Sequence, residues 1–72
     1  MNPESIRTLL RAQPFEPFEI RMSNGDAYIV RHPENVLLTG SRIAVADPAT
    51  DRLDILSLLH INGYRMLQPS AA

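Results

Sequence analysis

The dipeptide Asn24-Gly25 lies between two segments in which apolar and polar residues alternate, 18–22 (FEIRM) and 27–30 (AYIV). Alternation with a period of two is typical of a half-buried β-strand. Asn-Gly tolerates the positive φ angles that a tight type I′ turn requires, so the pattern predicts a β-hairpin with a two-residue loop. With that loop, apolar residues of the two strands fall opposite one another: Met22 with Ala27, and Ile20 with Ile29.

A second hairpin is predicted in VLLTGSRIAVA, residues 36–46, with Gly40-Ser41 as a two-residue type II′ loop. This loop places apolar residues in register on one face: Leu38 opposite Ile43, and Val36 opposite Val45. DPATD, residues 47–51, is rich in turn-forming residues and leads into a further strand. At Asn62-Gly63 the chain either turns sharply or bulges, and then continues as a last short strand.

The N-terminal segment predicts a short amphipathic helix from about Pro3 to Arg11. Asn2 can cap it, Pro3 suits the first helical position, and Glu4 favours the positive end of the helix dipole. Such a short helix must lay its apolar side on another element. The C-terminal residues 68–72 (QPSAA) are expected to be loosely packed.

One helix followed by about five short antiparallel strands is the pattern of a small SH3-like or Sm-like barrel. We therefore expect a single domain, residues 1–72, that is mainly β with one N-terminal helix and forms a five-stranded antiparallel barrel. An open α+β sheet with one helix is the alternative. The predicted core contains these residues: Leu9, Phe18, Ile20, Ile29, Val36, Leu38, Ile43, Val45, Ile55 and Leu58.

A chain of 72 residues buries a small core, and such domains usually need additional stabilisation. There is no cysteine to form a disulfide, and His32, His60 and the carboxylates lack the spacing of a structural metal site. No cofactor-binding motif is present. We therefore expect no metal and no cofactor, and predict that the chain self-associates.

The charge of the chain offers little to nucleic acid or membranes. The formal net charge is −1, and all 7 basic residues are arginines interleaved with acids, a pattern that favours ion pairs within the protein. No apolar run reaches membrane-spanning length, and the N-terminus lacks the order of a signal peptide. The expected location is the cytoplasm.

Three stretches, PFEPFEIRMSNG, VRHPE and SLLHI, together resemble a set of short bacterial proteins built on Pro-Phe-x-Pro-Phe-x-Ile, Gly, His-Pro-Glu and Leu-His-Ile. That resemblance covers most of the chain and implies no particular function. In the order of its elements, the chain also resembles Hfq and other Sm-like RNA-binding rings, through a strand ending in Asn-Gly, then ENVLL and HINGYRMLQP. The chain departs from that family in a short second strand without glycine, and in Asn62, where the family has arginine or lysine.

The Sm-like resemblance implies a barrel that assembles into a ring. It also implies RNA contacts at Asn35, His60 and Asn62, with the neighbouring Arg65. From its apolar neighbours alone, His60 is expected to be partly buried and hydrogen-bonded to backbone. Phe15 and Phe18, which could stack on bases, are interpreted instead as a hinge that docks the helix on the sheet.

The corner Arg31-His32-Pro33-Glu34-Asn35 is the densest polar cluster between two apolar runs. Pro33 cannot donate a ladder hydrogen bond, so the cluster marks the end of a strand. His32 and Glu34 lack a third group that would make an acid–base pair or a metal site, and we expect no enzyme activity. We expect Arg31 and His32 to pair with nearby carboxylates such as Glu19 or Glu34.

Two functions follow from these patterns. The preferred one is a non-catalytic interaction module that binds a protein partner, or copies of itself, through an edge strand and the contacts Arg31, His32, Glu34 and Asn35. The alternative is an Sm-like RNA-binding ring that uses Asn35, His60, Asn62 and Arg65. Phosphate contacts supply most non-specific RNA affinity, so the near-neutral charge favours the first.

Overall fold

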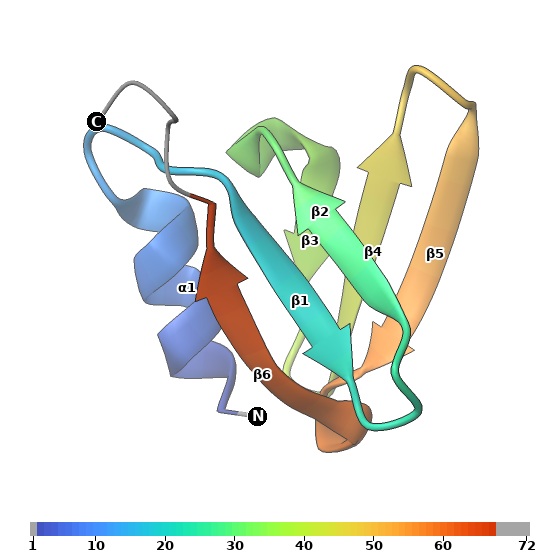
Figure 1. Cartoon of the computed structure of the whole chain (residues 1–72). Coiled ribbons are helices and arrows are strands. Elements are labelled where there is room, and N and C mark those ends of the chain that lie inside the picture. The colour runs from blue at the N-terminus through green and yellow to red at the C-terminus, as the bar shows by residue number, and fades with distance from the viewer. Residues whose placement is uncertain (1, 68–72) are drawn as a thin grey trace.

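The computed structural model describes residues 2–67. They form two three-stranded antiparallel sheets, with strand orders β2-β1-β6 and β3-β4-β5 (Figure 1). The elements are α1 (Pro3–Arg11), β1 (Phe18–Met22), β2 (Ala27–Val30), the 3-10 turn η1 (Pro33–Asn35), β3 (Val36–Leu38), β4 (Arg42–Asp47), β5 (Arg52–Ser57), the 3-10 turn η2 (Leu58–His60) and β6 (Ile61–Met66). The tail 68–72, predicted to be loosely packed, lies outside the described residues.

The prediction of a mainly β chain with one N-terminal helix is confirmed, but the five-stranded barrel is wrong. Six strands form two separate sheets that do not close on each other. The reason lies after Val30, where β2 ends and Pro33 opens η1 before the chain reaches β3. Because proline cannot continue a ladder, no strand at this corner runs through both sheets and joins them.

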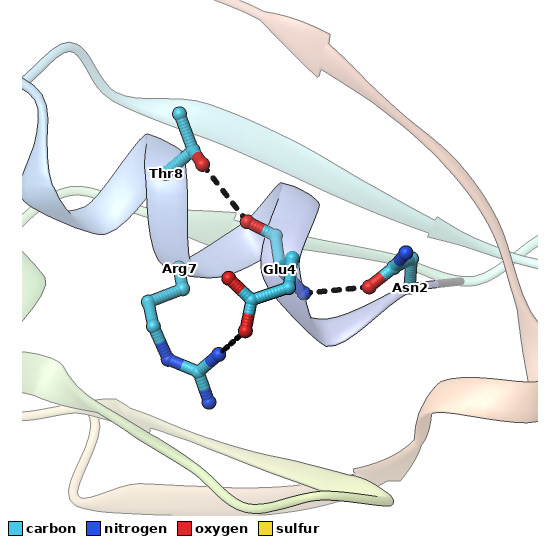
Figure 2. Close-up of polar contacts among 4 residues, drawn as sticks. All are labelled: Asn2, Glu4, Arg7 and Thr8. Carbon is cyan, nitrogen blue, oxygen red and sulfur yellow. Dashed lines mark hydrogen bonds and ion pairs between the residues drawn. The ribbon is translucent and has the colours of Figure 1, made fainter.

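Helix α1 begins as the sequence predicts. The Asn2 side chain accepts a hydrogen bond of 2.8 Å from the backbone N–H of Glu4. Figure 2 shows this cap together with the ion pair between Glu4 and Arg7 and the hydroxyl of Thr8, which donates to the Glu4 carbonyl at 2.9 Å. Ile6 is fully buried on the other side of the helix and joins the core of the sheets.

The first hairpin forms at the predicted place, but its loop has three residues, Ser23 to Gly25. Met22 donates to the Asp26 carbonyl at 2.8 Å, and Gly25 donates to the Met22 carbonyl at 3.0 Å. Gly25 has a φ of 95°, which makes the third loop residue left-handed. A turn followed by a left-handed glycine is the usual three-residue hairpin loop.

The extra loop residue shifts the predicted register by one. Ile20 pairs with Tyr28 and Phe18 with Val30, instead of Ile20 with Ile29. A shift of one residue moves each side chain to the other face of the sheet. Val30 is therefore buried, while Ile29, predicted to be a core residue, is 40% exposed.

The second hairpin has the predicted register, with Val36 opposite Val45 and Leu38 opposite Ile43. Thr39 donates to the Arg42 carbonyl at 2.8 Å across the two-residue loop. The type II′ geometry is wrong, because Gly40 does not adopt a positive φ. Instead, the Thr39 hydroxyl accepts a hydrogen bond of 2.9 Å from the backbone N–H of Arg42.

Strand β6 contains the bulge that the sequence offered as one of two outcomes at Asn62-Gly63. Arg21 pairs with Gly63, but the next residue, Met22, pairs with Ile61. Asn62 is thus the extra residue of β6. The chain continues through it to Met66 without a turn.

The core lies between the two sheets and α1. Five predicted core residues are buried (Phe18, Ile20, Ile43, Val45 and Leu58), and three are half-buried (Leu9, Val36 and Leu38). Four buried residues were not predicted: Ile6, Val30, Leu56 and Ile61. Ile55 is wrong as a core residue, because β5 pairs Leu56 with the buried Ile43 and so turns Ile55 outward, where it is 65% exposed. Phe15 packs against this core, with its ring centroid 6.1 Å from that of Phe18, as expected of a hinge between helix and sheet.

Candidate functional site

A groove of about 680 Å³ separates β2 from the hairpin of β4 and β5. One wall is built from β2 and the corner that follows it, and the opposite wall from the end of β4, the 48–49 turn and the start of β5. The two walls belong to different sheets (Figure 1). The lining residues that carry polar groups are Asp26, Tyr28, Arg31, His32, Asn35, Asp47, Arg52 and Asp54.

The groove is open because the inward positions of β4 and β5 change from apolar to charged along the strands. Ile43 pairs with Leu56, and both are buried. At the other end of the same face, Val45 pairs with Asp54, and Asp47 pairs with Arg52. Charged groups keep their water unless they are paired, so the apolar core ends at Val45 and solvent enters beyond it.

The three carboxylates of the groove all have partners within the chain. Asp26 accepts from the side-chain amide of Asn24 at 3.2 Å, and Asp47 accepts from the backbone N–H of Ala49 at 3.1 Å. Asp54 forms an ion pair of 3.5 Å with Arg52, whose side chain is 67% exposed. The acidic groups are therefore engaged in local structure.

The corner residues Arg31, His32 and Asn35, which the sequence analysis proposes as partner contacts, line the groove together. The end of β2 positions Arg31, while η1 positions Asn35, whose backbone N–H donates to the His32 carbonyl at 3.1 Å. Within residues 2–67, none of their three side chains has a hydrogen bond or ion pair. Glu34, the fourth predicted contact, is exposed and does not line the groove.

The predicted pairing of Arg31 or His32 with Glu19 or Glu34 is wrong in the described part of the chain. The Glu19 carboxylate lies 3.4 Å from the guanidinium of Arg21, two residues along the same strand. Its Oε1 atom is buried and makes no hydrogen bond there, so the contact is a charge interaction alone. Arg31 and His32 are left exposed on the groove wall.

The groove also contains a free strand edge. Among residues 2–67, strand β2 pairs with β1 on one side and with no strand on the other. Met22 and Asp26 are hydrogen-bonded to each other, and in an antiparallel ladder every second residue points its backbone groups toward the same neighbour. The N–H and C=O groups of Ala27 and Ile29 therefore point away from β1, and both residues line the groove.

The residues of the RNA alternative do not gather in one place. Asn35 lines the groove beside β2, whereas Asn62 and Arg65 lie on β6, at the opposite edge of the same sheet. His60 is exposed rather than partly buried. Its backbone carbonyl accepts two hydrogen bonds from Ser23, one from the backbone N–H at 2.8 Å and one from the hydroxyl at 3.1 Å.

Sequence reasoning missed the far wall of the groove. Asp47, Arg52 and Asp54 were treated as turn and strand residues, although Arg52 and Asp54 alternate with Leu53 and Ile55. That alternation shows a charged face and an apolar face, but not which of them turns inward. Only the pairing of β5 with β4 decides this.

Among residues 2–67, no three His, Asp or Glu residues come together in a way that could hold a metal ion. The one α-helix of that part of the chain is too short and too polar to cross a membrane. Comparison of the chain with models of protein families, with curated proteins and with solved structures found no match.

Proposed function

We propose that the protein is a non-catalytic interaction module of the cytoplasm that binds an extended segment of a partner protein in the groove. The observation that carries this proposal is that two sets of groups without hydrogen-bond partners among residues 2–67 lie in the same groove. These are the free edge of β2 and the unpartnered side chains of Arg31, His32 and Asn35. The groove volume of about 680 Å³ lies within the range of roughly 300–1,000 Å³ typical of binding clefts.

Strand addition explains how the backbone of the partner is held. An extended peptide that lies along β2 can pair with the outward N–H and C=O groups of Ala27 and Ile29. In this binding mode the backbone hydrogen bonds supply affinity, while alternate side chains of the peptide supply specificity. Every second side chain of such a peptide points toward the wall formed by β4 and β5.

The chemistry of the walls selects a partner with a carboxylate. The free groups of the corner are the guanidinium of Arg31, the ring of His32 and the amide of Asn35, which together are rich in hydrogen-bond donors. Every acid of the groove already has a partner, so the capacity that remains is for an acceptor. An arginine binds a carboxylate through two parallel hydrogen bonds, which makes Arg31 the main contact of the proposal.

The test uses extended, fluorescently labelled peptides of alternating valine and threonine, with glutamate, glutamine or lysine at the centre. We expect the glutamate peptide to bind most tightly in a fluorescence anisotropy titration. Loss of a hydrogen bond to a charged group costs about 1.5–3 kcal/mol, so Arg31→Ala is expected to weaken its binding by at least about tenfold. The wild-type protein should bind the glutamine peptide more weakly than the glutamate peptide by a similar factor.

The matched control is Arg65→Ala, which removes an exposed arginine from β6, outside the groove. Its affinity for the glutamate peptide should equal that of the wild type. The proposal is wrong if none of the peptides binds, if glutamate and lysine peptides bind equally, or if both arginine variants lose the same affinity.

A further inference from the structure

The outer face of the sheet β3-β4-β5 is apolar, although it faces away from the core. The ladder aligns Leu37, Ala44 and Ile55 in one row across the three strands, with Ala46 and Leu53 beside it. Leu37, Leu53 and Ile55 are 68%, 64% and 65% exposed. Together these five residues are called the outer apolar face below.

The side chains at positions 52–55 of β5 face the opposite way from those of an ordinary strand in a two-layer fold, where apolar residues face inward and charged residues face solvent. Strand β5 turns Arg52 and Asp54 toward the groove and Leu53 and Ile55 toward solvent. The helix does not cover these residues, since α1 packs with the core and lies on the side of the molecule opposite β5 (Figure 1). The free energy falls when a partner removes exposed apolar surface from water.

The outer apolar face can meet a second copy of itself through its large side chains. The central strand β4 contributes only the small Ala44 and Ala46, while the flanking strands contribute the larger Leu37, Leu53 and Ile55. The face is therefore a shallow trough between two ridges. About a two-fold axis across the strands, each strand of one copy faces the same strand of the other, so Leu37 meets Leu37 while Leu53 and Ile55 meet their counterparts.

The charges around the outer apolar face favour an antiparallel stacking of the two copies. The five residues carry no charge, but Arg42 lies on the same face at the start of β4, while Asp51 lies in the turn beyond its end. A two-fold axis along β4 would bring the two Arg42 residues together. An axis across the strands instead brings Arg42 of one copy to the turn that carries Asp51 in the other.

The apolar area of this face approaches what a specific dimer needs. Three large side chains about two-thirds exposed and two alanines present on the order of 400 Å² of apolar surface, within the roughly 300–600 Å² of the largest patch on a typical monomer. Stacking two copies buries twice this area, and the surrounding backbone and polar rim raise it toward the roughly 1,000 Å² that a biological interface needs.

We propose that the protein forms a homodimer in which the outer apolar faces of two copies stack, with their β4 strands antiparallel. The large side chains of this interface, Leu37, Leu53 and Ile55, do not line the groove, so the dimer is separate from the binding function proposed above. It also differs from association through strand edges, because it uses the face of the sheet. The groove remains open in both copies.

The test measures the mass of the full chain by analytical ultracentrifugation over a concentration series. We expect a reversible dimer for the wild type, and at least about a tenfold increase in its dissociation constant for Leu37→Glu and for Leu53→Glu. Ile29→Glu adds the same charge at an exposed isoleucine of the other sheet and should leave the dimer unchanged. Circular dichroism spectra like that of the wild type will show that each variant is folded.

Leu37→Glu and Leu53→Glu together separate face stacking from edge pairing, since Leu37 is on β3 and Leu53 on β5, the two edge strands of the sheet. Pairing through one edge would be lost only in the variant of that strand. A dimer lost in Leu53→Glu but kept in Leu37→Glu would show edge pairing and would overturn the proposal. A wild type that stays monomeric at millimolar concentration would also overturn it. So would equal weakening by Ile29→Glu, because a general charge effect would then explain the result.

Discussion

Asp54 lies directly opposite Val45 in the ladder between β5 and β4, so a carboxylate shares the inner face of the sheet with a buried valine. This pair marks the boundary between the core and the groove. On one side of it, Ile43 and Leu56 close the two sheets together, and on the other side Asp47 and Arg52 keep them apart. A groove at such a boundary leaves a smaller apolar core between the two sheets.

The first prediction is that Asp54→Val stabilises the fold and impairs the groove. A valine at this position extends the apolar inner face by one residue beyond Val45, which is expected to add about 1 kcal/mol. For a domain of this size that gain raises the thermal midpoint by roughly 4–8 °C in a calorimetric scan. Asp54→Asn is the control, because it removes the charge without adding apolar surface. A lower midpoint for Asp54→Val would show that this position does not face the core.

A second prediction compares two isoleucines on neighbouring strands. Ile43 is fully buried, whereas Ile55 is 65% exposed, although the alternation of the sequence marks both as core residues. Ile43→Ala is expected to lower the free energy of unfolding by about 2–5 kcal/mol. Ile55→Ala is expected to lower it by less than about 1 kcal/mol. Urea denaturation at low protein concentration, where a dimer contributes little, measures both values, and equal losses would contradict the register of β5.

Two glycines provide a third prediction. Gly25 has a φ of 95°, so Gly25→Ala places a Cβ in the left-handed region and should cost about 1–2 kcal/mol. Gly63 lies in β6 outside that region, and no atom lies within 4 Å of the Cβ that Gly63→Ala would add. This second variant should be as stable as the wild type or more stable by up to about 1 kcal/mol. Thermal unfolding of the two variants checks the three-residue loop, which an unchanged Gly25→Ala variant would disprove.

The fourth prediction concerns RNA. Asn35 lies at one edge of the β2-β1-β6 sheet and Asn62 and Arg65 at the other, and the chain has a net charge of −1. We therefore expect only weak binding of a short labelled single-stranded RNA, with no dependence on Arg65. Anisotropy titrations between about 50 and 200 mM salt test this. Micromolar binding that weakens steeply with salt and is lost in Arg65→Ala or Asn62→Ala would favour the RNA-binding ring instead.

Local chemistry was sufficient to predict several parts of the fold. The helix from Pro3 to Arg11 and the register of the second hairpin depend on caps, turns and short-range patterns that the sequence displays directly, and the bulge at Asn62 is one of the two outcomes that Asn62-Gly63 allowed. The first hairpin shows the limit of this reasoning. Asn24-Gly25 suits both a two-residue loop and a three-residue loop, and one extra loop residue was enough to exchange Ile29 for Val30 in the core.

The groove was predictable only in part. The polar corner stands out in the sequence, and three of its four predicted contacts line the groove. The residues of its opposite wall depend on which face of β5 turns inward. The alternation of Arg52, Leu53, Asp54 and Ile55 is compatible with either orientation, and the pairing with β4 decides between them. The sequence predicts Ile55 of β5 in the core because a chain normally buries its large apolar residues, and that expectation fails where charged residues of the strand face a groove instead.

The measurement that tests the central claim most directly is amide hydrogen exchange of the full chain, followed by NMR with and without the glutamate peptide. The account predicts that the amides of Ala27 and Ile29 exchange rapidly in the free protein, because they lie on the open edge of β2. Both should become protected when the peptide binds, and the protection should disappear in Arg31→Ala. Protection that appears on β5 or β6 while Ala27 and Ile29 continue to exchange rapidly would contradict the proposed groove.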